Sequence, residues 1–170
     1  MTVERVRAPR TAPDREMLES WLDFHRATLL LKCDGVPTDR LADRTVPPSS
    51  LSLLGLVRHM VDVERHWFLH VLPGVPRERG LYWTEDNPDG EFENIGAEDV
   101  EDAFKQFDVA CELARENAAG IEDLDWQTPP DRHGRVYTLR WIYVHMIEEY
   151  ARHNGHADLI REALDGVTGE

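Results

Sequence analysis

The sequence has few cysteines, few basic residues beside its many acidic ones, and no long apolar run. Its two cysteines, Cys33 and Cys111, form neither a CxxC pair nor a disulfide framework, so we expect reduced thiols packed in the interior. The chain has 19 Lys and Arg against 33 Asp and Glu, a formal net charge of −14. This charge repels phosphate backbones and anionic lipid headgroups, which argues against nucleic acid and membrane surfaces as partners.

The sequence also shows no pattern typical of a targeting segment or a membrane-spanning helix. No apolar run reaches the ~18 residues of a spanning helix, and the N-terminal MTVERVRAPR has no signal-peptide core. We therefore expect a soluble, cytoplasmic protein. The length of 170 residues suits one domain, so we expect residues 1–14, with Pro9 and Pro13, to form a loose arm and residues 15–170 a single helical domain.

Four segments carry apolar residues at helical spacing and are separated by Pro, Gly and acidic residues. This pattern predicts the all-α class and a four-helix bundle. The predicted helices run from about Arg15 to Lys32, from a cap at Ser49 or Ser50 to about Leu72, from about Ala97 to Ala119, and from a cap at Thr138 to Asp165.

The connection between the second and third predicted helices, residues 72–96, is long and has little periodicity. A loop of this length in a compact domain usually carries a function or is partly disordered. We therefore expect it to lie near the site, where Tyr82 and Trp83 could close over a substrate as a lid.

Histidine is the unusual residue of this sequence, since eight are present and most lie on the second and fourth predicted helices. Glu149 and His153 are four residues apart, so their side chains share one helix face, ~40° apart. His59 lies on the inward stripe of the second helix with Leu56 and Val63. If the two helices are neighbours, His59, Glu149 and His153 form a three-ligand metal site.

The chemistry of this donor set favours a catalytic centre over a structural one. Two neutral imidazoles and one carboxylate leave a divalent ion with a net positive charge and, in tetrahedral geometry, one open position. Zinc, nickel and iron all suit such ligands. His145 and His156 share the stripe, and either is expected to hydrogen-bond a ligand and so to orient it. The alternative is that Glu149 and His153 make only a weak surface pair, as residues four apart on a helix often do.

Other catalytic templates are absent from the sequence. It contains no HExxH, P-loop, GxGxxG or nucleophile elbow. The di-iron signature, Glu-x-x-His on each of two helices, is absent as well. One metal ion is therefore favoured over two.

Two segments, SLLGLVRHMVDVERHWF and HMIEEYARHNGHADLIRE, resemble the DinB-like superfamily of four-helix metal proteins. The chain is most similar to the small single-domain branch related to mycothiol-dependent maleylpyruvate isomerase and other low-molecular-weight-thiol S-transferases. The resemblance implies one divalent metal, often zinc or nickel, bound by a histidine of the second helix and two groups one turn apart on the last. Those positions fall on His59, Glu149 and His153. Many DinB-like members have histidine where this chain has Glu149, whereas the isomerase branch has glutamate.

The resemblance also implies a function. We expect a metal-dependent transferase, or a related lyase or hydrolase, that activates a small thiol such as mycothiol toward a small-molecule electrophile. A thiolate would form at the metal because a coordinated thiol loses its proton at neutral pH. DinB-like bundles commonly pair through helices, so a homodimer is expected. The alternative is a non-catalytic dimeric helical module that binds a metal or a small ligand.

Overall fold

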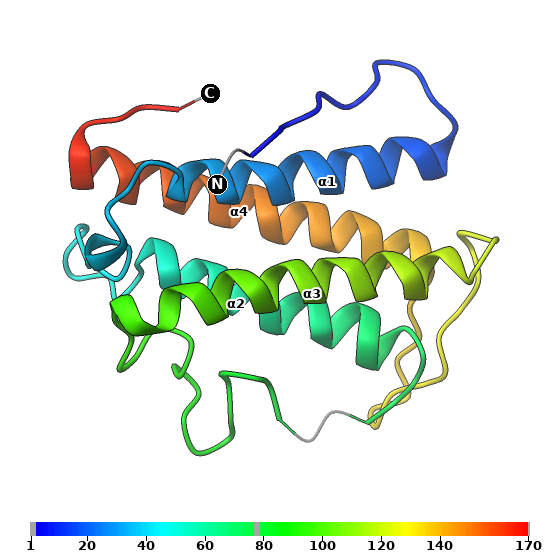
Figure 1. The fold of residues 1–170 in the computed structure, drawn as a ribbon. Coiled ribbons are helices and arrows are strands. Elements are labelled where there is room, and N and C mark those ends of the chain that lie inside the picture. The colour runs from blue at the N-terminus through cyan, green and yellow to red at the C-terminus, as the bar shows by residue number, and fades with distance from the viewer. Residues whose placement is uncertain (1–2, 77–78, 170) are drawn as a thin grey trace.

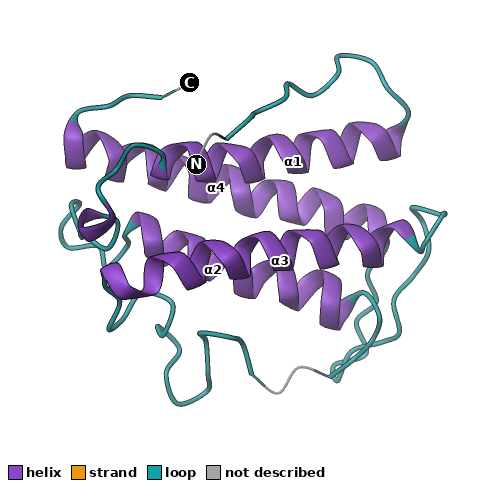
Figure 2. Ribbon diagram, viewed as in Figure 1, coloured by secondary structure: helices purple, strands orange, loops and turns teal. Residues whose placement is uncertain are grey.

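The computed structural model describes residues 3–76 and 79–169, so the first two residues of the predicted arm and residues 77–78 of the long connection lie outside the described residues. Its four long helices are α1 (Asp14–Cys33), α2 (Leu53–Glu64), α3 (Val100–Ala119) and α4 (Leu139–Asp165). The predicted all-α bundle is confirmed, because the described residues contain no strand, only an isolated bridge between Gln127 and Thr138 (Figure 2). No helix among them has the length and apolar content needed to cross a membrane.

The helices pack as two pairs, α1 with α4 and α2 with α3 (Figure 1). The long connection runs from the end of the second helix to a short 3₁₀ turn, η3 (Ala97–Asp99), that leads into α3. A second 3₁₀ turn, η1 (Thr38–Arg40), lies between α1 and α2. The helices α2 and α4 also contact each other, which is the condition that the three-ligand prediction required.

Arg5, in the segment before α1, contacts the second half of that helix. The guanidinium of Arg5 lies over the Phe24 ring, 4.9 Å from its centroid, and Arg5 Nη1 donates to Thr28 Oγ1 at 3.4 Å. At least Arg5 of the residues expected to form a loose arm thus contacts α1 in this structure.

The predicted helix ends are correct for α4 and displaced for α2. Thr138 caps α4 as predicted, since its Oγ1 accepts from the N–H of Trp141 at 3.1 Å. The cap of α2 is Ser52, whose Oγ accepts from Gly55 N–H at 3.1 Å, rather than Ser49 or Ser50. The reason is that Ser49 serves a turn before the helix, with its Oγ accepting from the N–H of Leu51.

The second predicted helix does not keep one geometry to its end. The α-helix stops at Glu64 and continues as a π-helical segment, η2 (Arg65–Val71), closed by a hydrogen bond from Leu72 N–H to Trp67 C=O at 2.9 Å. The wider turn rotates the following side chains away from the 3.6-residue stripe. Trp67 consequently meets the side chains of Trp141 and His145 on α4.

A charged group lies fully buried where the helices meet. Glu64 accepts two hydrogen bonds from the buried guanidinium of Arg26, both at 2.7 Å, and one from the Tyr150 hydroxyl at 2.8 Å. Arg26 also pairs with Asp23 at 2.9 Å, and Cys111 Sγ lies 3.9 Å from the Glu64 carboxylate. These contacts join α1, α2, α3 and α4 around one carboxylate.

We expect Arg26→Met to lower the free energy of unfolding by about 3–5 kcal/mol, because it leaves the Glu64 carboxylate buried without its cation. Urea denaturation followed by circular dichroism measures this change. The control is Arg135→Met, which removes an exposed pair with Asp131 and should hardly shift the midpoint. Equal midpoint shifts in the two variants would contradict this interpretation of the buried pair.

Candidate metal centre

The structure brings the three predicted ligands together between α2 and α4. His59, Glu149 and His153 each offer a ligand atom, and these atoms lie within 4.8 Å of one another. His153 Nε2 is 3.4 Å from Glu149 Oε2, and the rings of His59 and His153 are 4.7 Å apart between centroids. Their side chains are 25%, 16% and 12% exposed, so the group is accessible from solvent.

The imidazoles of His59 and His153 each have a second polar neighbour, next to Nδ1. Nδ1 of His153 lies 3.4 Å from Nδ1 of His156, and Nδ1 of His59 lies 3.5 Å from Oε1 of Glu91. Each Nδ1 thus has a polar neighbour outside the three-residue group, and Nε2 of His153 is the ring atom near Glu149. Metal-binding histidines usually have a hydrogen-bond partner on the ring nitrogen that does not bind the ion.

His153 is suited to binding a cation because it stays neutral. Burial, together with the nearby imidazoles of His59 and His156 and the guanidinium of Arg152, lowers the pKa of His153 to about 3. A neutral imidazole has a free lone pair at physiological pH, so no proton has to leave before an ion binds.

The two histidines expected to support the ligands lie next to them. His156 contacts His153 as described, and His145 Nε2 is 3.7 Å from Glu149 Oε1. His145 also stacks on Trp141, with ring centroids 4.9 Å apart, and lies edge-on to Trp67 at 4.6 Å. With Glu148 and Glu149 it forms a second, more exposed group of potential ligands that shares Glu149 with the first.

The long connection lies against α2 through two side chains one turn apart. The buried carboxylate of Asp62 accepts from the backbone N–H groups of residues 81–83, with the bonds from Tyr82 and Trp83 at 2.9 and 2.8 Å. The Arg58 guanidinium lies over the Tyr82 ring, 4.2 Å from its centroid. The residues expected to form a lid are therefore tied to α2 in this structure.

Asp62 and Glu91 were not predicted from the sequence. The role of Asp62 could have been predicted, because a carboxylate inside the apolar run of the second helix needs buried hydrogen-bond donors. The role of Glu91 could not have been predicted, since this residue lies in a segment without periodicity.

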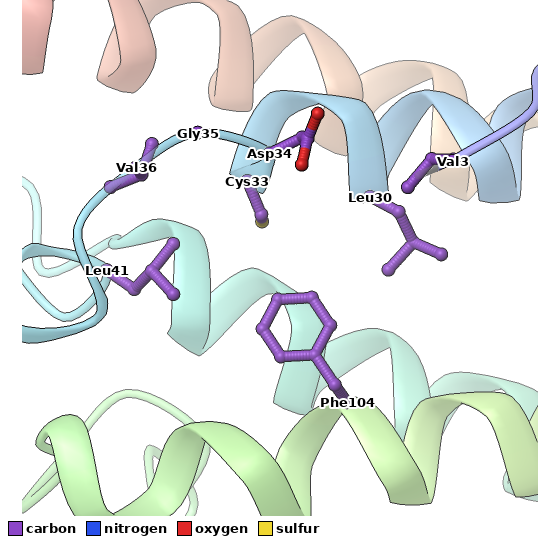
Figure 3. Close-up of a pocket in the computed structure, with 8 residues that line it drawn as sticks. All are labelled: Val3, Leu30, Cys33, Asp34, Gly35, Val36, Leu41 and Phe104. Atoms are coloured by element: carbon purple, nitrogen blue, oxygen red, sulfur yellow. The ribbon is translucent and has the colours of Figure 1, made fainter. Parts of the chain in front are cut away.

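A small pocket lies away from these residues, between the end of α1, the η1 region and α3 (Figure 3). Leu30, Cys33, Leu41 and Phe104 are among its lining residues. Its volume of about 180 Å³ is below the roughly 300–1,000 Å³ of sites that enclose drug-sized ligands. No predicted metal ligand lines it.

The cysteines are free and buried, as predicted. Burial raises the pKa of the Cys33 thiol to about 12, and burial together with the Glu64 carboxylate does the same for Cys111. Neither thiol is a nucleophile at neutral pH.

We expect both thiols to react with Ellman's reagent at least ~100-fold more slowly in the native protein at pH 8 than in guanidinium chloride. The absorbance of the coloured thiolate that the reagent releases measures this rate. A native cysteine that reacts at the denatured rate would contradict the burial described above.

Asp62→Ala should release the connection from α2, because it removes the acceptor of three backbone donors. We expect amide hydrogen exchange in residues 79–84 to accelerate by ~10-fold or more while α1 keeps its protection. The matched control is Asp86→Ala, an exposed carboxylate of the same segment. Unchanged exchange at residues 81–83 in Asp62→Ala would count against the anchoring role.

Comparison with known proteins identifies the family. Residues 17–166 match the family model described as Mycothiol-S-transferase. A search of the curated proteins finds no match. Because the family model covers most of the chain, and the bundle has the expected helices, the protein belongs to the mycothiol S-transferase family within the DinB-like superfamily.

Proposed function

We propose that the protein is a metal-dependent transferase that joins mycothiol, or a similar low-molecular-weight thiol, to an electrophilic small molecule. The observation that carries the proposal is the convergence of His59, Glu149 and His153 in a chain of the mycothiol S-transferase family. The reaction forms a carbon–sulfur bond, releases the thiol proton, and either expels a leaving group or adds a proton to the electrophile.

The donor set supports this proposal. Two imidazole nitrogens and one carboxylate suit zinc first, with nickel and iron as alternatives, and three protein ligands leave a position for the substrate. The partial exposure of all three side chains gives a small thiol access to that position. An ion bound there would lower the pKa of the thiol so that the thiolate forms at neutral pH.

The chain's own residues have distinct roles in this proposal. His59, Glu149 and His153 hold the ion, and His156 and His145 orient His153 and Glu149 by the contacts described above. Trp141 and Trp67 surround His145 and form an aromatic surface beside Glu149. That surface suits the apolar part of an electrophile.

The metal is tested first, on protein purified without a His-tag or a nickel column. We expect close to one divalent ion per chain by elemental analysis, and loss of that ion in His59→Ala and His153→Ala. His133→Ala is the control, because His133 is exposed on the turn before α4. A wild-type protein that binds no divalent ion with micromolar affinity would overturn the proposal.

Thiol conjugation is tested next, with mycothiol and a panel of epoxides, alkyl halides and activated alkenes. Conjugation should fall at least ~100-fold in His59→Ala and His153→Ala, whose folds are checked by circular dichroism, and should persist in His133→Ala. If the wild-type protein binds the metal but conjugates no electrophile, the non-catalytic module is the better description.

A further inference from the structure

A carboxylate from the long connection lies against the first of the three proposed ligands. The Glu91 side chain is 7% exposed, and its Oε1 is 3.5 Å from Nδ1 of His59, at the long limit of a hydrogen bond. The next residue, Phe92, stacks on the His59 ring at 5.8 Å between centroids. Two adjacent residues of a segment without helical structure thus bound the imidazole on two sides.

The backbone around Glu91 is fixed by close contacts with α2 and with its own segment. A Cβ at Gly55 of α2 would lie 2.5 Å from Phe92 Cδ1, so only glycine lets the Phe92 ring pack this close. A Cβ at Gly90 would overlap the carbonyl oxygen of Tyr82. Both neighbours of Glu91 therefore occupy positions with little freedom.

Two guanidinium groups add hydrogen bonds on either side. Arg58 donates to the carbonyl of Gly90 at 3.0 Å, and Arg44 donates to the carbonyl of Phe92 at 2.6 Å. Since Arg58 and His59 are adjacent on α2, the same helix turn that carries the imidazole also holds the chain that presents the carboxylate. Loop placement and ligand placement are thus coupled.

We propose that Glu91 is a positioning residue, which accepts the Nδ1–H of His59 and thereby holds the ring in the tautomer that presents Nε2 to the metal. The inference rests on the proposed metal site. It assigns a function to the long connection, namely completing a carboxylate–histidine–metal arrangement.

The geometry separates this role from that of a ligand. Among the described residues, the group of ligand atoms within 4.8 Å of one another contains Glu149 and both histidines but not Glu91. Glu91 faces Nδ1, the ring atom on which an Nε2-bound imidazole carries its proton.

The test compares Glu91→Ala and Glu91→Gln with Glu93→Ala, an exposed glutamate of the same segment. Zn²⁺ affinity is measured by competition with a chromophoric chelator, and the visible absorption of the Co²⁺-loaded protein reports ligand geometry. We expect Glu91→Ala to weaken Zn²⁺ binding ~10–100-fold and to alter the Co²⁺ spectrum. Glu91→Gln, which keeps an acceptor oxygen, should recover part of the affinity, and Glu93→Ala should match wild type.

The outcomes separate this inference from the proposed function. If wild type binds Zn²⁺, His59→Ala abolishes binding, and Glu91→Ala binds within ~3-fold of wild type with an unchanged Co²⁺ spectrum, the positioning role is overturned and the metal site stands. If Glu91→Ala loses the ion as completely as His59→Ala while its melting temperature is kept, Glu91 is a ligand, which also overturns it. If wild type binds no metal, both proposals fail.

Discussion

The buried ion pair of Arg26 and Glu64 determines how the helices meet at the candidate site. Glu64 lies five residues after His59 on α2, and its third hydrogen-bond donor, Tyr150, directly follows Glu149 on α4. A slip of α2 along α4 by one turn, ~5.4 Å, would break the bond between Glu64 and Tyr150 and would also separate His59 from Glu149. Loss of that bond would be costly, because the desolvation cost of a buried charge remains when a partner is removed. The bond between Glu64 and Tyr150 therefore favours the register of α2 and α4 in which His59 approaches Glu149.

The helix α2 also holds the long connection in place, through the side chains of Arg58 and Asp62. Asp62 binds three backbone amides, and Arg58 contacts both the Tyr82 ring and the Gly90 carbonyl. The same short helix thus carries the buried Glu64 carboxylate, the His59 imidazole that faces α4, and the side chains of Arg58 and Asp62 that hold the loop. Substitution of Glu64 should consequently act mainly on stability, whereas substitution of Arg58 or Asp62 should act on the loop and, through Glu91, on His59.

Much of this architecture was predictable from the sequence because it depends on local periodicity. The 3.6-residue spacing gave the four helices and the cap at Thr138, and the four-residue spacing put Glu149 and His153 on one face. The inward stripe predicted that His59 would face them, and the three residues do meet, although their binding of a metal stays a prediction. The wrong cap of α2 arose because Ser49 and Ser52 are equally good caps, and only the turn after the prolines decides between them.

What could not be predicted depends on contacts between residues distant in the chain. Glu91 and His59 are 32 residues apart, and Arg26 and Glu64 are 38 apart. No periodic pattern links such pairs. A glutamate in an acidic loop, such as Glu91, is expected from the sequence to be exposed to solvent. The π-helical segment after Glu64 also broke the expected stripe, so the contact of Trp67 with His145 could not be read from spacing.

The burial of both cysteines fits a transferase whose nucleophile is supplied by its substrate. An electrophile that reacts with the substrate thiolate would also alkylate exposed thiols of the enzyme, if those thiols ionised at neutral pH. Burial raises the pKa of both thiols to about 12, so neither competes for the electrophile. In the proposed reaction an ion held by His59, Glu149 and His153 would make the small thiol the more acidic one, because the charge of the ion would favour the thiolate. The guanidinium groups near Cys33 and Cys111 do not offset the effect of burial, which keeps the pKa of both thiols high.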